Sequence, residues 1–70
     1  MLMPNYPKIV LAFNYNGWKL EIDEGELDGM TTYTVWANNA FSSAVAVPYA
    51  TSRQEAIQRA KRWVDARLKA

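Results

Sequence analysis

The C-terminal stretch Ser52–Ala70, SRQEAIQRAKRWVDARLKA, decides the fold. Its first four residues match a capping box, in which the Ser52 hydroxyl accepts from the backbone N–H of Glu55 and the Glu55 carboxylate reaches back to the Ser52 amide. Apolar residues then recur at the helical period of about 3.6 residues: Ala56, Ile57, Ala60, Trp63, Val64 and Leu68. The stretch therefore predicts an amphipathic helix over residues 52–69 that docks on a sheet.

The composition limits the chemistry that is open to the chain. Its 70 residues allow a single small α+β domain over residues 1–70. It contains no cysteine and no histidine, so it lacks thiols, the commonest general base and the commonest metal ligand. We therefore expect a non-enzymatic protein with no cofactor, no metal and no small-molecule substrate.

Charge and hydropathy indicate the expected location of the protein in the cell. Half of the residues are hydrophobic, which favours an ordered core over a disordered segment. The net charge of +1 is too small to attract nucleic acid or an anionic membrane by overall balance. No apolar run approaches the roughly 18 residues of a membrane span, and Met1–Pro4 lacks the features of a secretory signal. We expect a cytoplasmic protein with no membrane partner.

A hairpin is predicted between residues 8 and 23. Asn16-Gly17 is the pair preferred in a two-residue type I′ turn, because both positions need a positive φ. This turn sets Tyr15 opposite Trp18, Phe13 opposite Leu20 and Leu11 opposite Ile22. Side chains alternate along a strand, so one face receives Ile9, Leu11, Phe13, Tyr15, Trp18, Leu20 and Ile22. The other face receives Val10, Ala12, Asn14, Lys19, Glu21 and Asp23.

Two more strands are predicted after the hairpin. Residues 24–29 form an acidic surface loop, residues 31–37 a third strand, and residues 40–47 a fourth strand that ends at Pro48. A turn at Asn38-Asn39 joins these strands. It places Thr34, Trp36, Phe41, Ser43, Val45 and Val47 on one face, and Tyr33, Val35, Ala40, Ser42, Ala44 and Ala46 on the other. The sequence leaves open which face is the core.

These elements predict an α+β fold. It consists of an antiparallel sheet of four strands, or of three, with one C-terminal helix packed across one face (ββββα). Residues 1–7 contain two prolines and are expected to form an irregular arm.

The C-terminal helix also carries six of the eight basic residues. A candidate phosphate-binding surface consists of Arg59, Lys61, Arg62, Arg67 and Lys69, with Arg59, Arg62 and Lys69 as its main members. The same helix fits an ordinary solvated face, because Glu55 and Asp65 stand at i,i+4 spacing from several of these cations. Both interpretations stay open.

The acidic segment offers a second candidate. Glu24-x-Glu26-x-Asp28-Gly29 resembles the start of a calcium loop, but Val35 stands where such a loop needs its bidentate glutamate. We expect a solvated turn or an acidic docking site here, and no metal site.

Large aromatic side chains on both faces of the sheet supply the third candidate. One helix covers only one face, and an uncovered apolar face commonly marks an interaction surface. The candidate partner-binding residues are Tyr33, Trp36 and Phe41. Trp36 and Phe41 are exposed if the helix covers the Tyr33 face, and Tyr33 and Val35 if it covers the other. Alternatively, the arm with Leu2, Met3 and Tyr6 covers the bare face.

Two family resemblances concern the same segments. Trp18-Lys19-Leu20-Glu21-Ile22, followed by a further strand region and Thr51–Ala60, resembles the plan of plant AP2-type DNA-binding domains, which implies DNA binding by the sheet. Glu21 and Asp23 stand where that family implies arginines and tryptophans. The spacing Thr51…Glu55-Ala56-Ile57…Ala60-Lys61 is similar to an element of HicB-like antitoxins, which neutralise a small RNA-cleaving toxin. We assign the chain to neither family.

The sequence thus favours a small protein-interaction module: a regulator, adaptor or inhibitor that binds a protein partner, or a subunit that associates with itself, for example as a homodimer. The alternative is a nucleic-acid-binding protein that uses the basic C-terminal helix.

Overall fold

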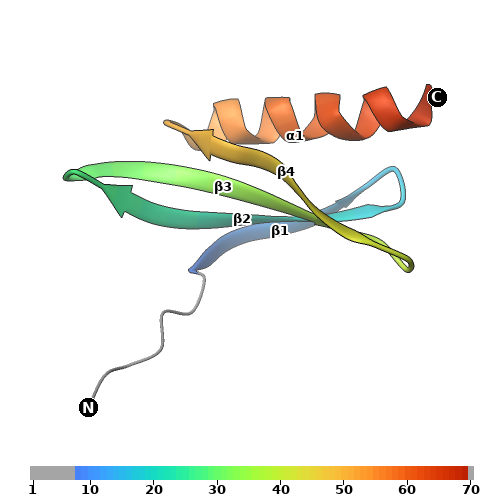
Figure 1. Cartoon of the computed structure of the whole chain (residues 1–70), viewed down its shortest axis with the longest axis horizontal. Coiled ribbons are helices and arrows are strands. Elements are labelled where there is room, and N and C mark those ends of the chain that lie inside the picture. The colour runs from blue at the N-terminus through green and yellow to red at the C-terminus, as the bar shows by residue number, and fades with distance from the viewer. Residues whose placement is uncertain (1–7, 70) are drawn as a thin grey trace, which may run out of the picture.

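The computed structural model describes residues 8–69, which form an antiparallel sheet with one helix packed on it (Figure 1). The strands are β1 (Ile9–Tyr15), β2 (Trp18–Leu27), β3 (Met30–Asn38) and β4 (Ser43–Ala50), paired in the order β1-β2-β3-β4. The helix α1 spans Arg53–Leu68. The predicted ββββα fold is confirmed, with four strands. The predicted arm of residues 1–7 lies outside the described residues.

The first hairpin has the predicted register. Asn16 and Gly17 form the turn with φ values of 48° and 87°, as a type I′ turn requires. Tyr15 pairs with Trp18, Phe13 with Leu20 and Leu11 with Ile22. The turn chemistry and the hydrophobic alternation specify the same register, so the pairing is defined locally.

Two residues of this hairpin lie on the other face from the one predicted. Ile9 pairs with Asp23, whereas Leu11 pairs with Ile22, so Val10 is the extra residue of a β-bulge. The bulge turns Ile9 to the face of Asp23, where it is exposed, while Val10 packs against the core. The prediction that Ile9 shares a face with Leu20 and Ile22 was therefore wrong, and so was the prediction that Val10 lies on the face of Asp23.

The acidic segment is part of a second hairpin and not a surface loop. Strand β2 continues to Leu27, β3 begins at Met30, and only Asp28-Gly29 turns the chain. Both turn residues have positive φ values, 51° and 78°. Asp-Gly is a preferred type I′ pair, so the signal was present in the sequence. Cross-strand pairing of residues 24–27 with residues 30–33 explains how this acidic stretch is held as a strand.

The last hairpin also differs from the prediction. Asn38 pairs with Ser43, so residues 39–42 form the loop, and β4 runs through Pro48 to Ala50. Asn39 stabilises the loop, because its Oδ1 accepts from the backbone N–H groups of Phe41 and Ser42 at 2.8 and 2.7 Å. Pro48 is tolerated because β4 is an edge strand. Register shifts around Val35 place Val47 opposite it on the buried face, away from Trp36.

Ser52 is the N-cap of α1, as predicted. Its Oγ accepts from the backbone N–H of Glu55 at 3.1 Å. The Glu55 carboxylate, however, accepts from the backbone N–H of Thr51 at 2.9 Å and from the Thr51 hydroxyl at 3.2 Å. The reciprocal bond therefore goes to the residue before the cap, and the prediction that it reaches the Ser52 amide was wrong.

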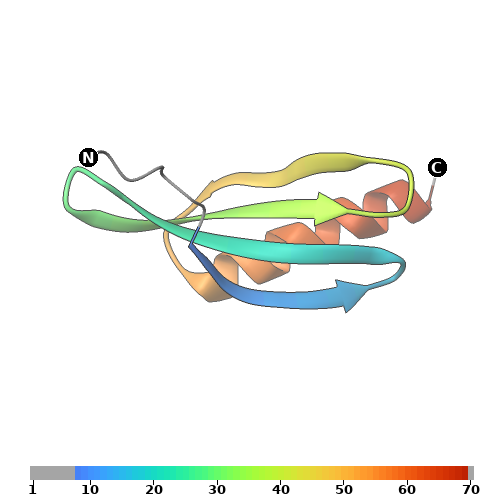
Figure 2. The same cartoon turned by 90° about the horizontal axis from the view of Figure 1, so that it is seen from below.

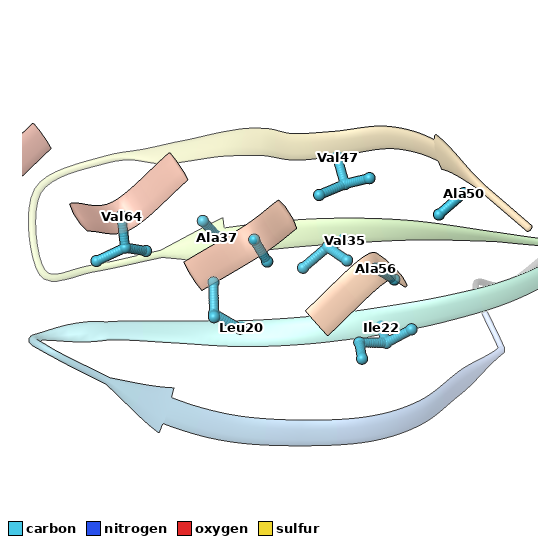
Figure 3. Close-up of a cluster of buried hydrophobic side chains, with 9 residues drawn as sticks. Leu20, Ile22, Val35, Ala37, Val47, Ala50, Ala56 and Val64 are labelled. Atoms are coloured by element: carbon cyan, nitrogen blue, oxygen red, sulfur yellow. The ribbon is translucent and has the colours of Figure 1, made fainter. Parts of the chain in front are cut away.

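The core lies between α1 and one face of the sheet, against β2, β3 and β4 (Figures 2 and 3). Its fully buried residues are Leu20, Ile22, Val35, Ala37, Val47, Ala50, Ala56, Ala60 and Val64. The helix thus covers the Val35 face, which settles the question that the sequence left open. Small side chains at Ala56 and Ala60 let the helix approach the sheet closely. Leu68, predicted for the apolar stripe, lies past the sheet contact with 57% of its surface exposed.

Candidate functional site: the uncovered face of the sheet

The face of the sheet opposite α1 is the main candidate site, and we call it the outer face. Its residues alternate with the buried ones along β2 and β3 and fall into cross-strand rows. The central row is Ala12, Glu21, Trp36 and Val45. On one side of it lies the row Asn14, Lys19, Asn38 and Ser43, and on the other lie Ile9, Asp23 and Thr34. Figure 2 looks onto this face, with the helix behind the sheet.

Trp36 is the largest side chain of the outer face. It pairs with Glu21 on one side and Val45 on the other, and 38% of its surface is exposed. Val45 and Ile9 are exposed to a similar extent. A hollow of about 330 Å³ beside the tryptophan is lined by Ile9, Glu21, Trp36 and Asn38. The outer face therefore combines apolar area with a carboxylate at its centre.

Glu21 is held in place by its neighbour on β3. Asn38 Nδ2 donates to Glu21 Oε1 at 2.7 Å. This bond occupies one oxygen of the Glu21 carboxylate and restrains the side chain. Glu21 and Trp36 are direct cross-strand partners, so the restrained carboxylate stands beside the Trp36 side chain. A fixed carboxylate next to an aromatic face is suited to a cationic group, which gains both an ion pair and a cation–π contact.

A second hollow lies toward the first turn. It has a volume of about 550 Å³ and is lined by Asn14, Gly17, Trp18, Lys19, Asn38 and Asn39. Asn38 lines both hollows. Amide groups and one lysine dominate this end of the outer face, so it forms a polar border to the apolar area around Trp36.

The three predicted partner-binding aromatics do not gather on one surface. Tyr33 pairs with Ala50 on the helix side of the sheet and packs partly buried against the core. Trp36 lies on the outer face, so the predicted opposition of these two side chains is confirmed. Phe41 stands on the loop of residues 39–42 with 96% of its surface exposed. Trp36 and Phe41 are thus the exposed pair.

Sequence reasoning named Trp36 but not its neighbours. Val45 stood on the same predicted face as Trp36, so alternation was a sufficient signal for it. Ile9 reaches this face only through the bulge at Val10. No turn residue in the sequence signals that bulge. Glu21 and Asn38 became part of the site through the pairing of β2 with β3, and the sequence offered no signal that pairs them.

Most of the basic candidates on α1 already have contacts. Arg59 donates to the Tyr49 carbonyl and lies 3.9 Å from the Glu55 carboxylate. The Arg67 guanidinium stacks on the Trp63 ring with its carbon 3.4 Å from the ring centroid. The Lys61 ammonium lies over the rings of Phe13 and Tyr15. Arg62 and Lys69 are exposed, and phosphate binding by this helix stays an untested prediction.

The acidic and basic segments are joined on the helix side of the sheet. Glu24 lies 3.0 Å from Lys8 Nζ and 3.3 Å from Arg53 Nη2. The hydrogen bond from Lys8, and then that from Arg53, lower the pKa of Glu24 below its usual 4.5. The Arg53 pair connects β2 with the first turn of α1, and the Lys8 pair connects β2 with the residue before β1. Part of the acidic cluster seen in the sequence therefore serves the docking of the helix.

The part of the chain that the structure describes lacks two further features. Within residues 8–69, no three histidine, cysteine, aspartate or glutamate side chains gather in a group that could hold a metal ion. Over the same range, no helix combines the length and the apolar character that crossing a membrane requires.

The sequence matches no protein-family model, and it shows no significant similarity to a curated protein or to a solved structure. The two family resemblances gain no support from these comparisons. Any function must therefore be inferred from the surface itself.

Proposed function

We propose that this chain is a small, non-enzymatic protein-interaction module that binds a protein partner through the outer face around Trp36. The observation that carries the proposal is the coverage of the sheet: α1 packs on one face and leaves Trp36, Val45 and Ile9 partly exposed on the other. Trp36 pairs with Val45 and shares a hollow with Ile9. Contiguous apolar area with a polar border is typical of a binding surface.

The charges of the outer face favour a particular kind of partner. Glu21 and Asp23 contribute two carboxylates, against one ammonium group from Lys19. A partner segment that presents apolar side chains together with a lysine or arginine fits this surface, since the cation can contact the Trp36 ring and the Glu21 carboxylate at once. A second copy stacked on this face would set two net-negative surfaces against each other, so a different protein fits better.

Affinity capture followed by titration tests the proposal. The partner is first captured from a lysate of the source cells with and without nuclease and is then purified. Its affinity is measured by calorimetry for the wild-type chain, for Trp36→Ser and for Leu68→Ser. We expect Trp36→Ser to cost about 2 kcal/mol or more, roughly a thirtyfold loss of affinity, because a central tryptophan is a common hot spot.

Leu68→Ser is the matched control, since Leu68 is exposed on the helix side of the molecule. We expect it to bind as the wild type does. We also expect Glu21→Gln to weaken binding and to make it less sensitive to salt. Equal affinities of wild type and Trp36→Ser would refute the outer face as the binding surface. Loss of the captured species on nuclease treatment would favour the nucleic-acid alternative.

A further inference from the structure

The two edges of the sheet differ in how they are protected. Strand β4 forms one edge and contains Pro48, which has no N–H to donate, and its pairing with β3 is irregular around Val35. Proline residues and bulges commonly prevent an edge strand from pairing with a strand of another chain. Strand β1 forms the other edge. It has a bulge at Val10, but its pairing is regular from Leu11 to Tyr15, and its seven residues IVLAFNY include neither a proline nor a charged residue.

The backbone of β1 has regular pairing groups on its free side. The two-residue turn makes Tyr15 and Trp18 a hydrogen-bonded pair, and such pairs alternate along an antiparallel ladder. The N–H and C=O groups of Ala12 and Asn14 consequently point away from β2. Pairing is unbroken from Leu11 to Tyr15. Within residues 8–69, no strand pairs with this outward side of β1.

The side chains of β1 also leave apolar area uncovered. Leu11 shares the helix side of the sheet with Phe13, but α1 lies mainly over β2, β3 and β4. Leu11 is therefore 39% exposed. Phe13 is only partly buried, with the Lys61 ammonium 5.9 Å from its ring centroid. A strand added beside β1 would bury both side chains and satisfy the free backbone groups.

We infer that the β1 edge pairs with β1 of a second copy, which joins two sheets into one continuous eight-stranded sheet. Antiparallel pairing about Phe13 sets Ala12 opposite Asn14, and Leu11 opposite Tyr15, of the second copy. Two identical strands meet without opposing like charges, because β1 has none. The two-fold symmetry limits the assembly to two copies, since the β4 edges, with Pro48 and irregular pairing, do not pair with further strands.

This arrangement has two structural consequences. Antiparallel strands related by a two-fold axis perpendicular to the sheet keep both helices on one side and both outer faces on the other. The Lys61 ammonium lies over the Phe13 and Tyr15 rings, and the Asp65 carboxylate accepts from the Tyr15 hydroxyl, so charges of both signs stand beside this edge. We therefore expect the association to depend only weakly on ionic strength.

Sedimentation and light scattering of the full chain test the inference. We expect a mass of twice 8.0 kDa that gives way to the single-chain mass on dilution. Ala12→Pro removes an outward N–H without touching the bonds to β2, and Leu11→Lys places a charge in the interface. Both variants should have the single-chain mass while keeping the circular dichroism of the wild type.

Val45→Lys is the matched control, because Val45 is exposed to a similar extent but lies on the opposite edge strand. It should stay dimeric, as should Trp36→Ser, which separates this inference from the proposed partner site. If Ala12→Pro fails to fold, Leu11→Lys alone decides. A wild-type chain that stays monomeric at millimolar concentration would overturn the inference, and so would a dimer that survives Leu11→Lys or is lost in Val45→Lys or Trp36→Ser.

Discussion

The Tyr15 hydroxyl lies 3.0 Å from Oδ1 and 3.2 Å from Oδ2 of Asp65, so it donates to the carboxylate of a helix residue that lies 50 positions further along the sequence. This bond ties the end of β1 to the fourth turn of α1. The hydrogen bond to Asp65, followed by desolvation, raises the pKa of Tyr15 above its usual 10.0. The first hairpin and the helix are thereby coupled at a position where α1 contributes few other contacts to β1.

Tyr15→Phe should lower the denaturant midpoint at neutral pH, because the Asp65 carboxylate loses its donor. The raised pKa means that the folded state favours the neutral phenol. The contribution of the Tyr15–Asp65 hydrogen bond to the free energy of unfolding is therefore fully present below about pH 10 and is lost as the pH rises through the folded-state pKa of Tyr15. The variant should consequently lose part of the alkaline destabilisation of the wild type. Tyr49→Phe, at an exposed tyrosine of β4, is the control, and an unchanged midpoint in Tyr15→Phe would contradict the prediction.

Ser52→Ala should destabilise the protein by about 0.5–2 kcal/mol through loss of the N-cap. The Glu55 N–H then has no side-chain acceptor at the start of α1. Urea unfolding followed by tryptophan fluorescence measures the change. Ser52→Asn, which keeps a capping oxygen, should retain most of the stability. Equal midpoints for the alanine and asparagine variants would show that the cap contributes nothing.

Acid should destabilise the fold through two carboxylates. The pKa of Glu24 is lowered by Lys8 and Arg53, and that of Glu55 by the backbone N–H of Thr51. A carboxylate whose pKa is lower in the folded state contributes stability above its unfolded-state pKa of 4.5. This stability is lost as the pH falls through the folded-state pKa.

The double variant of Glu24→Gln and Glu55→Gln should therefore be less stable at neutral pH and show a flatter fall in midpoint below pH 4.5. Urea midpoints at a series of pH values check this. Glu26→Gln, at an exposed residue near the tip of the second hairpin, should behave as the wild type does. A double variant with the acid profile of the wild type would contradict the assignment.

Duplex nucleic acid should not bind tightly at physiological salt, because the Arg59 and Arg67 side chains are engaged within the chain. Fluorescence anisotropy over a salt series measures this. If the helix did bind phosphates, affinity would fall steeply with salt, and Arg59→Glu with Arg62→Glu would abolish it. A sub-micromolar complex with that salt slope would reverse the order of the two functional hypotheses.

The first hairpin and the capped helix could be predicted from the sequence because their determinants are local. Asn16 and Gly17 accept the positive φ values of the turn, and the turn alone sets every pair from Tyr15–Trp18 to Leu11–Ile22. Ser52 accepts from an N–H three residues away. The Asp28-Gly29 turn is equally local. The acidic residues before it are typical of a surface loop by composition, but cross-strand pairing holds them extended.

For the candidate site, the sequence determined the alternation that brings Trp36 and Val45 to one face, and the excess of aromatic residues for one helix to cover. Only the tertiary structure decided that α1 packs on the Val35 face, that the bulge at Val10 sends Ile9 outward, and that Glu21 stands beside Trp36. The physical reason is that a turn or a cap depends on a few neighbouring dihedral angles and hydrogen bonds. The covered face depends instead on the summed burial of side chains from β2, β3, β4 and α1, and no single segment contains that sum.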